Sequence, residues 1–250
     1  MSDFKKSKRI QTYDAIFILN GFIFILIGMV VTIPFILFHM SLAPISNSIK
    51  SPWGIITSNF VYDGSGNLEA YILYMSPFLA TSSAYGYGTR KKRYLTIIYS
   101  MYVGGVIANG LWLYTMLTQS NSVTSAGESS VIYAFIGACF ALILIDSIII
   151  VFGWPHDKLF KKKPYLYYLK SPMRIWRWVG GSFSIGLSIV LLANLYDGRV
   201  AFFSEYSHIN FTVHIYGFIS GSLIAGAVYL YDLYLLSKSA KDVDVVLPMK

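Results

Sequence analysis

The sequence predicts an all-α, polytopic membrane protein that forms one domain over residues 1–250. Of the 250 residues, 55% are hydrophobic and only 13% are charged, and the hydrophobic residues gather in six long runs. A soluble domain carries about 25% charged residues, so a chain this poor in charge cannot cover a soluble surface. The same hydrophobicity excludes an intrinsically disordered chain. No charged linker or low-complexity tract divides the chain into parts.

Six runs are long enough to cross a membrane, because a bilayer core about 30 Å thick needs roughly 20 helical residues. The first run is too long for the apolar region of a signal peptide, so we expect it to remain as a span. The second run contains Pro77, which membrane helices tolerate where neighbouring helices satisfy the backbone. We therefore expect the second helix to lie against protein rather than lipid. The predicted spans cover approximately residues 15–38, 68–87, 95–117, 130–154, 178–195 and 211–236.

The basic residues predict the orientation of these spans. In a six-span chain, all of the 20 Lys and Arg residues except Lys50 and Arg199 fall on one side. Positive residues are retained in the cytoplasm during insertion, so we expect both termini to be cytoplasmic. Among them, residues 90–93 (Arg-Lys-Lys-Arg) are assigned to the loop after the second span. The net charge of +8 could also indicate a surface that binds nucleic acid. The one-sided distribution of the basic residues disfavours this alternative.

The lipid bilayer is therefore the first expected partner, and the expected location is the plasma membrane of a prokaryote. Cys139 is the one cysteine, and it lies inside an apolar run. A single cysteine excludes both a disulfide framework and a cysteine-based metal site. We expect neither a metal nor another cofactor.

Polar residues inside predicted spans are the candidates for chemistry, because they are costly there. Ser129 opens the fourth span, directly after Gly127 and Glu128, and His214 lies a few residues into the sixth. Both of these helix starts are on the external side of the six-span topology. A serine at a helix start is commonly an N-cap, and a lone histidine in a span is commonly structural. Their coincidence at one depth favours a functional pair.

Small residues in the same two spans predict that the fourth and sixth helices pack closely. They recur at about four-residue spacing, which lets two membrane helices approach one another. Close approach is what a Ser–His hydrogen bond requires. The residues concerned are Ser130, Ala134, Ala138 and Ala141 in the fourth span and Gly217, Gly221 and Ala225 in the sixth.

Two motifs resemble those of the rhomboid family of intramembrane serine proteases. GESSVIYAFIGA (127–138) is similar to the Gly-x-Ser-Gly signature that opens the family's fourth helix, with a Tyr or Phe one turn later. HIYGFISG (214–221) is similar to the His-x-x-Gly-x-x-x-Gly motif of its sixth helix, and residues 57–75 more loosely resemble the run into its second helix. The resemblance implies a six-helix rhomboid-like bundle that cleaves transmembrane protein substrates without a cofactor.

Roles for particular residues follow from this resemblance. It implies that Ser129 is the nucleophile, that His214 is the general base and that the ring of Tyr133 packs on His214. Backbone N–H groups at the start of the fourth helix, next to Gly127, would receive the oxyanion, where the helix dipole is positive. Asn67 and Tyr71 stand where the family has His and Asn as further oxyanion donors, and Gly217 and Gly221 would pack the sixth helix on the fourth.

Departures from the family pattern keep two alternatives open. Ser130 replaces the usual Gly, Glu128 replaces a small apolar residue, and the first external loop lacks the family's Trp-Arg pair. Glu128 and Ser130, together with Asn67 and Tyr71, favour the first alternative, a catalytically inactive rhomboid-like protein that binds membrane clients. The second alternative is a small transporter or channel subunit that uses Asp146, an acidic residue deep in the fourth span.

Overall fold

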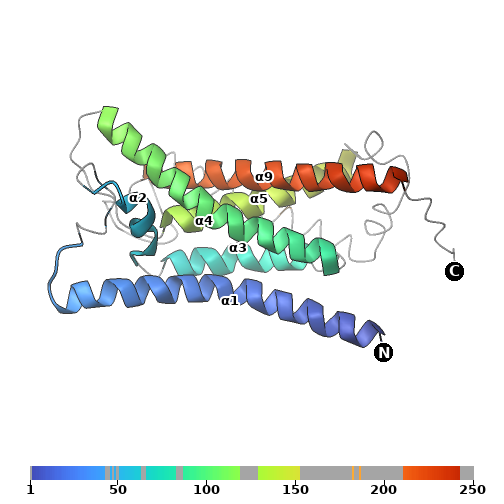
Figure 1. Cartoon of the computed structure of the whole chain (residues 1–250), viewed down its shortest axis with the longest axis horizontal. Coiled ribbons are helices and arrows are strands. Elements are labelled where there is room, and N and C mark those ends of the chain that lie inside the picture. The colour runs from blue at the N-terminus through green and yellow to red at the C-terminus, as the bar shows by residue number, and fades with distance from the viewer. Residues whose placement is uncertain are drawn as a thin grey trace.

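A computed structural model shows a bundle of long helices (Figure 1). All the regular elements of the described residues are helical. The structure describes residues 2–42, 51–62, 66–82, 87–118, 129–152 and 211–242, together with Ser46, Ser48, Ser182 and Gly186. The predicted fifth span, residues 178–195, thus lies almost wholly outside the described part, as does the end of the second span after residue 82.

Four of the helices are long and apolar enough to cross a membrane, which identifies the chain as an integral membrane protein. They lie in α1 (Ser2–Leu37), α4 (Tyr87–Thr118), α5 (Ser129–Phe152) and α9 (Phe211–Asp242). Their apolar segments, Asp14–Leu37, Lys91–Thr118, Ser129–Asp146 and Thr212–Leu235, overlap the predicted first, third, fourth and sixth spans. The second predicted span corresponds to α3 (Gly66–Ser82), whose 17 described residues make it the shortest of the long helices.

The helices are arranged around α5. Of the residues in its apolar segment 78% are buried, against 33% in α1, so α5 is central and α1 peripheral. The face that α1 turns away from the bundle carries Leu, Ile and Val side chains, as expected of a helix that faces lipid. α3 buries Tyr71, Tyr74, Met75 and Phe78, so the expectation that the second helix lies against protein is confirmed.

α1 and α4 run in one direction, and α3, α5 and α9 run in the other (Figure 1). Near the first turns of α4, Tyr94 donates a hydrogen bond of 2.6 Å to Asp14 in α1, and further along both helices Tyr102 donates to Asn20. α1 and α4 therefore run the same way. α5 and α9 run parallel to each other, because Ser222 bonds Gly137 and, further along both helices, Tyr229 bonds Asp146. α9 runs opposite to α4, because Ser220 bonds Gly104 whereas Tyr229, further along α9, bonds Arg93 near the start of α4.

Two elements of the predicted external loop are helical turns, which the sequence reading did not anticipate. α2 (Gly54–Thr57) continues directly into the 3-10 helix η1 (Ser58–Phe60). The backbone N–H of Tyr62 then donates a 2.8 Å hydrogen bond to the hydroxyl of Thr32 in α1. This stretch is thereby held against the bundle at the end where α5 and α9 begin.

One assignment was wrong: residues 90–93 are not in a loop but in the first turns of α4. An apolar segment defines only the part of a helix inside the membrane, and the helix itself continues through the charged residues beyond it. Lys92 forms a half-exposed ion pair with Asp232 of α9 at 3.2 Å. Arg93 is fully buried, so it is a core residue and not a free surface charge.

Candidate active site

The candidate site lies where α5 and α9 begin, and glycines bring these two helices together there. A Cβ built on Gly217 would stand 2.5 Å from the carbonyl oxygen of Ser130, and one built on Gly221 would collide with the carbonyl of Ala134. No side chain larger than hydrogen fits either position without moving the helices apart. The packing role expected of these two glycines agrees with this geometry.

Ser129, Tyr133 and His214 lie at the same level of this contact. Ser129 is the first residue of α5, Tyr133 follows one turn later on the same face, and His214 is in the first turn of α9. The Tyr133 and His214 rings stack with centroids 4.1 Å apart and planes 6° from parallel. Ser129 and His214 are both buried, with exposed fractions of 9% and 6%. A nucleophile and a base sheltered from bulk water in this way are suited to acyl transfer.

Ser130, the neighbour of the candidate nucleophile, is held in a buried polar cluster that the sequence reading missed. Its hydroxyl donates a 2.9 Å hydrogen bond to the side-chain oxygen of Asn59 in η1. The amide nitrogen of Asn109 in α4 donates to that same oxygen at 2.8 Å and to the Ser130 hydroxyl at 3.3 Å. We call Asn59, Asn109 and Ser130 the amide cluster.

The backbone around the amide cluster leaves room for it. The amide nitrogen of Asn59 donates back to the Ile55 carbonyl at 3.0 Å, so the side chain stays within its own helical turn. A Cβ on Gly105 would stand 3.2 Å from the Asn59 side-chain oxygen and would strike the side chain of Val131. Asn109 carries an amide in an otherwise apolar segment, and this was the available signal for the cluster.

The other residues implied by the resemblance are placed as follows. Tyr71 is fully buried, and its hydroxyl donates a 3.0 Å hydrogen bond to the Phe17 carbonyl in α1. Since a phenol has one proton to donate, Tyr71 bonds α3 to α1 and has none left for an oxyanion in this conformation. Asn67 is in the first turn of α3, but its side chain, like Gly127 and Glu128, lies outside the described part.

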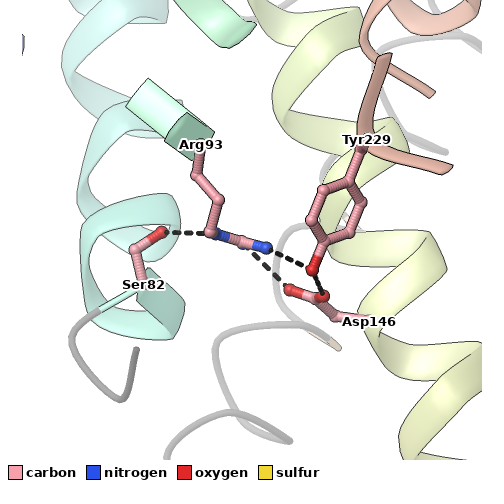
Figure 2. Close-up of polar contacts among 4 residues, drawn as sticks. All are labelled: Ser82, Arg93, Asp146 and Tyr229. Atoms are coloured by element: carbon pink, nitrogen blue, oxygen red, sulfur yellow. Dashed lines mark hydrogen bonds and ion pairs between the residues drawn. The ribbon is translucent and has the colours of Figure 1, made fainter. Parts of the chain in front are cut away.

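Asp146, the residue of the transporter alternative, belongs to a buried network at the opposite end of the bundle (Figure 2). One carboxylate oxygen pairs with Arg93 at 2.9 Å and the other accepts a 2.8 Å hydrogen bond from Tyr229. The Arg93 guanidinium also donates to Tyr229 at 3.0 Å and to Ser82 at 3.4 Å. It lies over the rings of Phe78 and Tyr229, 5.3 Å and 5.2 Å from their centroids. A buried charge pair of this kind joins α3, α4, α5 and α9.

Among the described residues, no group of three His, Cys, Asp or Glu side chains could hold a metal ion. Comparison with known proteins adds no relative: no family model, no curated protein and no solved structure matches the chain. The chain is an integral membrane protein. It has a buried serine and a stacked histidine at one end of its central helix pair and a buried ion pair at the other.

Proposed function

We propose that the chain is a rhomboid-like intramembrane serine endopeptidase in which Ser129 and His214 form the catalytic dyad. The stacking of Tyr133 on His214, one turn from Ser129, is the observation that carries the proposal. A dyad has no carboxylate to orient the imidazole, so another group has to fix it. A parallel ring at 4.1 Å, itself buried, restricts rotation of the imidazole.

The proposed reaction follows from these positions. His214 accepts the Ser129 proton as the hydroxyl attacks the substrate carbonyl, and then returns that proton to the leaving amine. Water hydrolyses the acyl-enzyme with the same base. Ser129 begins α5, and the first N–H groups of a helix have no acceptor within that helix, so we assign the developing oxyanion to them. Their contribution is needed all the more because the Tyr71 hydroxyl is bonded to Phe17.

The proposal includes a six-span topology with both termini in the cytoplasm of a prokaryotic cell. That topology requires α1 and α4 to run one way and α3, α5 and α9 the other, and the described helices have these directions. It also requires Ser129 and His214 to lie near the external surface. The substrates of such an enzyme are transmembrane proteins, which reach the dyad from the bilayer.

The test uses the purified full-length protein with a fluorophosphonate probe and a panel of single-span substrates. Wild type should be labelled and should cleave, whereas Ser129→Ala and His214→Ala should each lose nearly all activity. The double variant should lose little more, because the two residues act as one unit. Labelling of Ser129→Ala at the wild-type rate would refute the assignment of the nucleophile.

A catalytically inactive, client-binding protein is the second candidate, and the bonded Tyr71 hydroxyl is the observation that favours it. Wild-type protein that keeps its melting transition but neither labels nor cleaves would refute the first candidate and leave this one. The transporter alternative has no comparable support, since Asp146 is bonded to Arg93 and Tyr229.

A further inference from the structure

We infer that Asn59 and Asn109 are positioning residues for Ser129, acting through the hydroxyl of Ser130. This inference rests on the proposed protease function. It assigns a purpose to Ser130, which stands where the resemblance implies a glycine. The amide cluster takes one residue from each of three elements, η1, α4 and α5, that are distant in the sequence.

The hydrogen bonds of the amide cluster converge on one atom. The side-chain oxygen of Asn59 accepts from Ser130 at 2.9 Å and from Asn109 at 2.8 Å. Asn109 also donates to the Ser130 hydroxyl at 3.3 Å, so the three side chains close a ring of contacts. All three are buried, and a hydrogen bond in such surroundings is stronger and better defined than one in water.

Ser130 is also held from the side of α9. Its carbonyl oxygen lies against Gly217, where even a methyl group would be too close. The second residue of α5 is thus fixed by its side chain toward η1 and α4 and by its backbone toward α9. Because Ser129 is the residue before it, the position of the candidate nucleophile depends on this double contact.

Such support matters at this place in a helix. Ser129 is the first residue of α5, and a first turn lacks the preceding turn that holds residues further along. The effect of misplacement is large, since a shift of about 1 Å in a reacting group can slow a reaction by roughly 10²-fold. The geometry gives the amide cluster one role in catalysis: to limit movement of Ser129 relative to His214.

The experiment measures the fluorophosphonate labelling rate of the full-length protein, separated into a saturating rate and a half-saturation concentration. The variants are Ser130→Ala, Asn59→Ala, Asn109→Ala and the double variant Ser130→Ala with Asn59→Ala, all assayed below the lowest melting temperature. Each single variant should lower the saturating rate about tenfold with an unchanged half-saturation concentration. The double variant should be little slower than Asn59→Ala, because both changes remove the same hydrogen bond.

Ser222→Ala is the matched control. The hydroxyl of Ser222 likewise donates a hydrogen bond between two helices, to the Gly137 carbonyl at 3.0 Å, and Gly137 lies about two turns beyond Ser130 in α5. Ser222→Ala should lower the melting temperature while its saturating rate stays within about twofold of wild type. An equal loss of rate in Ser222→Ala would overturn the inference, because the effect would then be one of general stability.

The remaining outcomes separate this inference from the proposed function. If wild type labels and Ser130→Ala labels equally fast, the positioning role is refuted and the dyad stands. If wild type neither labels nor cleaves, both are refuted. If Asn59→Ala does not fold, Ser130→Ala decides the matter, since it removes a single oxygen from the cluster.

Discussion

The imidazole of His214 and the ring of Tyr133 lie parallel, with centroids 4.1 Å apart. The two residues belong to helices α9 and α5, whose closest approach is set by Gly217 and Gly221. Stacking between aromatic rings is worth about 0.5–1.5 kcal/mol beyond the area that it buries, so it can select one orientation of the imidazole. The ring of Tyr133, not its hydroxyl, is therefore expected to matter for activity.

Substitution of Tyr133 tests this expectation. Tyr133→Phe keeps the stacked ring and should retain cleavage within about threefold, whereas Tyr133→Ala should lower the saturating rate by roughly 10²-fold, the effect of a misplaced catalytic group. Single-turnover cleavage and fluorophosphonate labelling both report this rate. A Tyr133→Phe variant as slow as Tyr133→Ala would show that the hydroxyl, and not the ring, is required.

Substitution of Tyr71 tests whether its hydroxyl stabilises the fold or serves the oxyanion. Its bond to the Phe17 carbonyl is buried, so Tyr71→Phe should destabilise the protein by about 1 kcal/mol and lower its melting temperature. The labelling rate should be unchanged, because that hydroxyl bonds α3 to α1. Loss of labelling with an unchanged melting temperature would mean that Tyr71 serves the oxyanion after all.

The Arg93–Asp146 pair predicts a strongly non-additive effect on stability. Arg93→Met alone leaves a buried carboxylate without its counter-charge and should cost about 3–5 kcal/mol, as should Asp146→Leu alone. The double variant should be more stable than either, since two apolar side chains replace the pair. Thermal melts of the four proteins in detergent give the coupling energy.

The same double variant should keep its labelling rate. Asp146 lies 17 residues after Ser129 in one helix, which corresponds to about 25 Å. If the labelling rate of the double variant falls while its melting temperature is unchanged, the ion pair affects the dyad. The two ends of the bundle would then not have separate roles.

The proposed six-span topology predicts which positions can be labelled from outside intact cells. In a Cys139→Ala background, cysteines at Met40 and Ser204 should react with an impermeant thiol reagent, and cysteines at Thr12 and Ser239 should not. Met40 is 57% exposed just beyond the end of α1, so neighbouring residues do not shield a cysteine at this position from the reagent. Reaction at Thr12 in sealed cells would invert the proposed orientation.

Much of the fold could be predicted because apolar length and the distribution of charge depend on the sequence alone. Four predicted spans overlap helices that could cross a membrane, and the glycine spacing of α9 predicted its packing on α5. The start predicted for α4 was wrong because the apolar segment defines only the part of a helix inside the membrane. The helix itself begins in the charged residues before that segment. Residues 54–60 were expected to be loop, since short helical turns carry almost no periodic signal.

The candidate site divides in the same way. Ser129 and His214 were singled out because they lie at similar depth in two predicted spans, whereas the stacking of Tyr133 on His214 was implied by the resemblance to rhomboid proteases. Asn59 and Asn109 were missed because their partner is chosen by tertiary contacts over 50 and 71 residues of chain, and no local pattern records those. The pairing of Arg93 with Asp146 could not be predicted, because it depends on how α4 and α5 pack together and not on a local sequence pattern (Figure 2).

The ion pair also imposes an order on biosynthesis. Ser82 precedes Arg93 in the chain, but Asp146 and Tyr229 follow it, and Tyr229, which completes its surroundings, is 136 residues further along. At about 5–20 residues per second, the guanidinium waits roughly 7–30 s for the last helix. Asp146 is made before Tyr229, so the ion pair can form before the hydrogen bonds to Tyr229 do. The buried network around Arg93 is therefore complete only after α9 has been synthesised and has packed on α4 and α5.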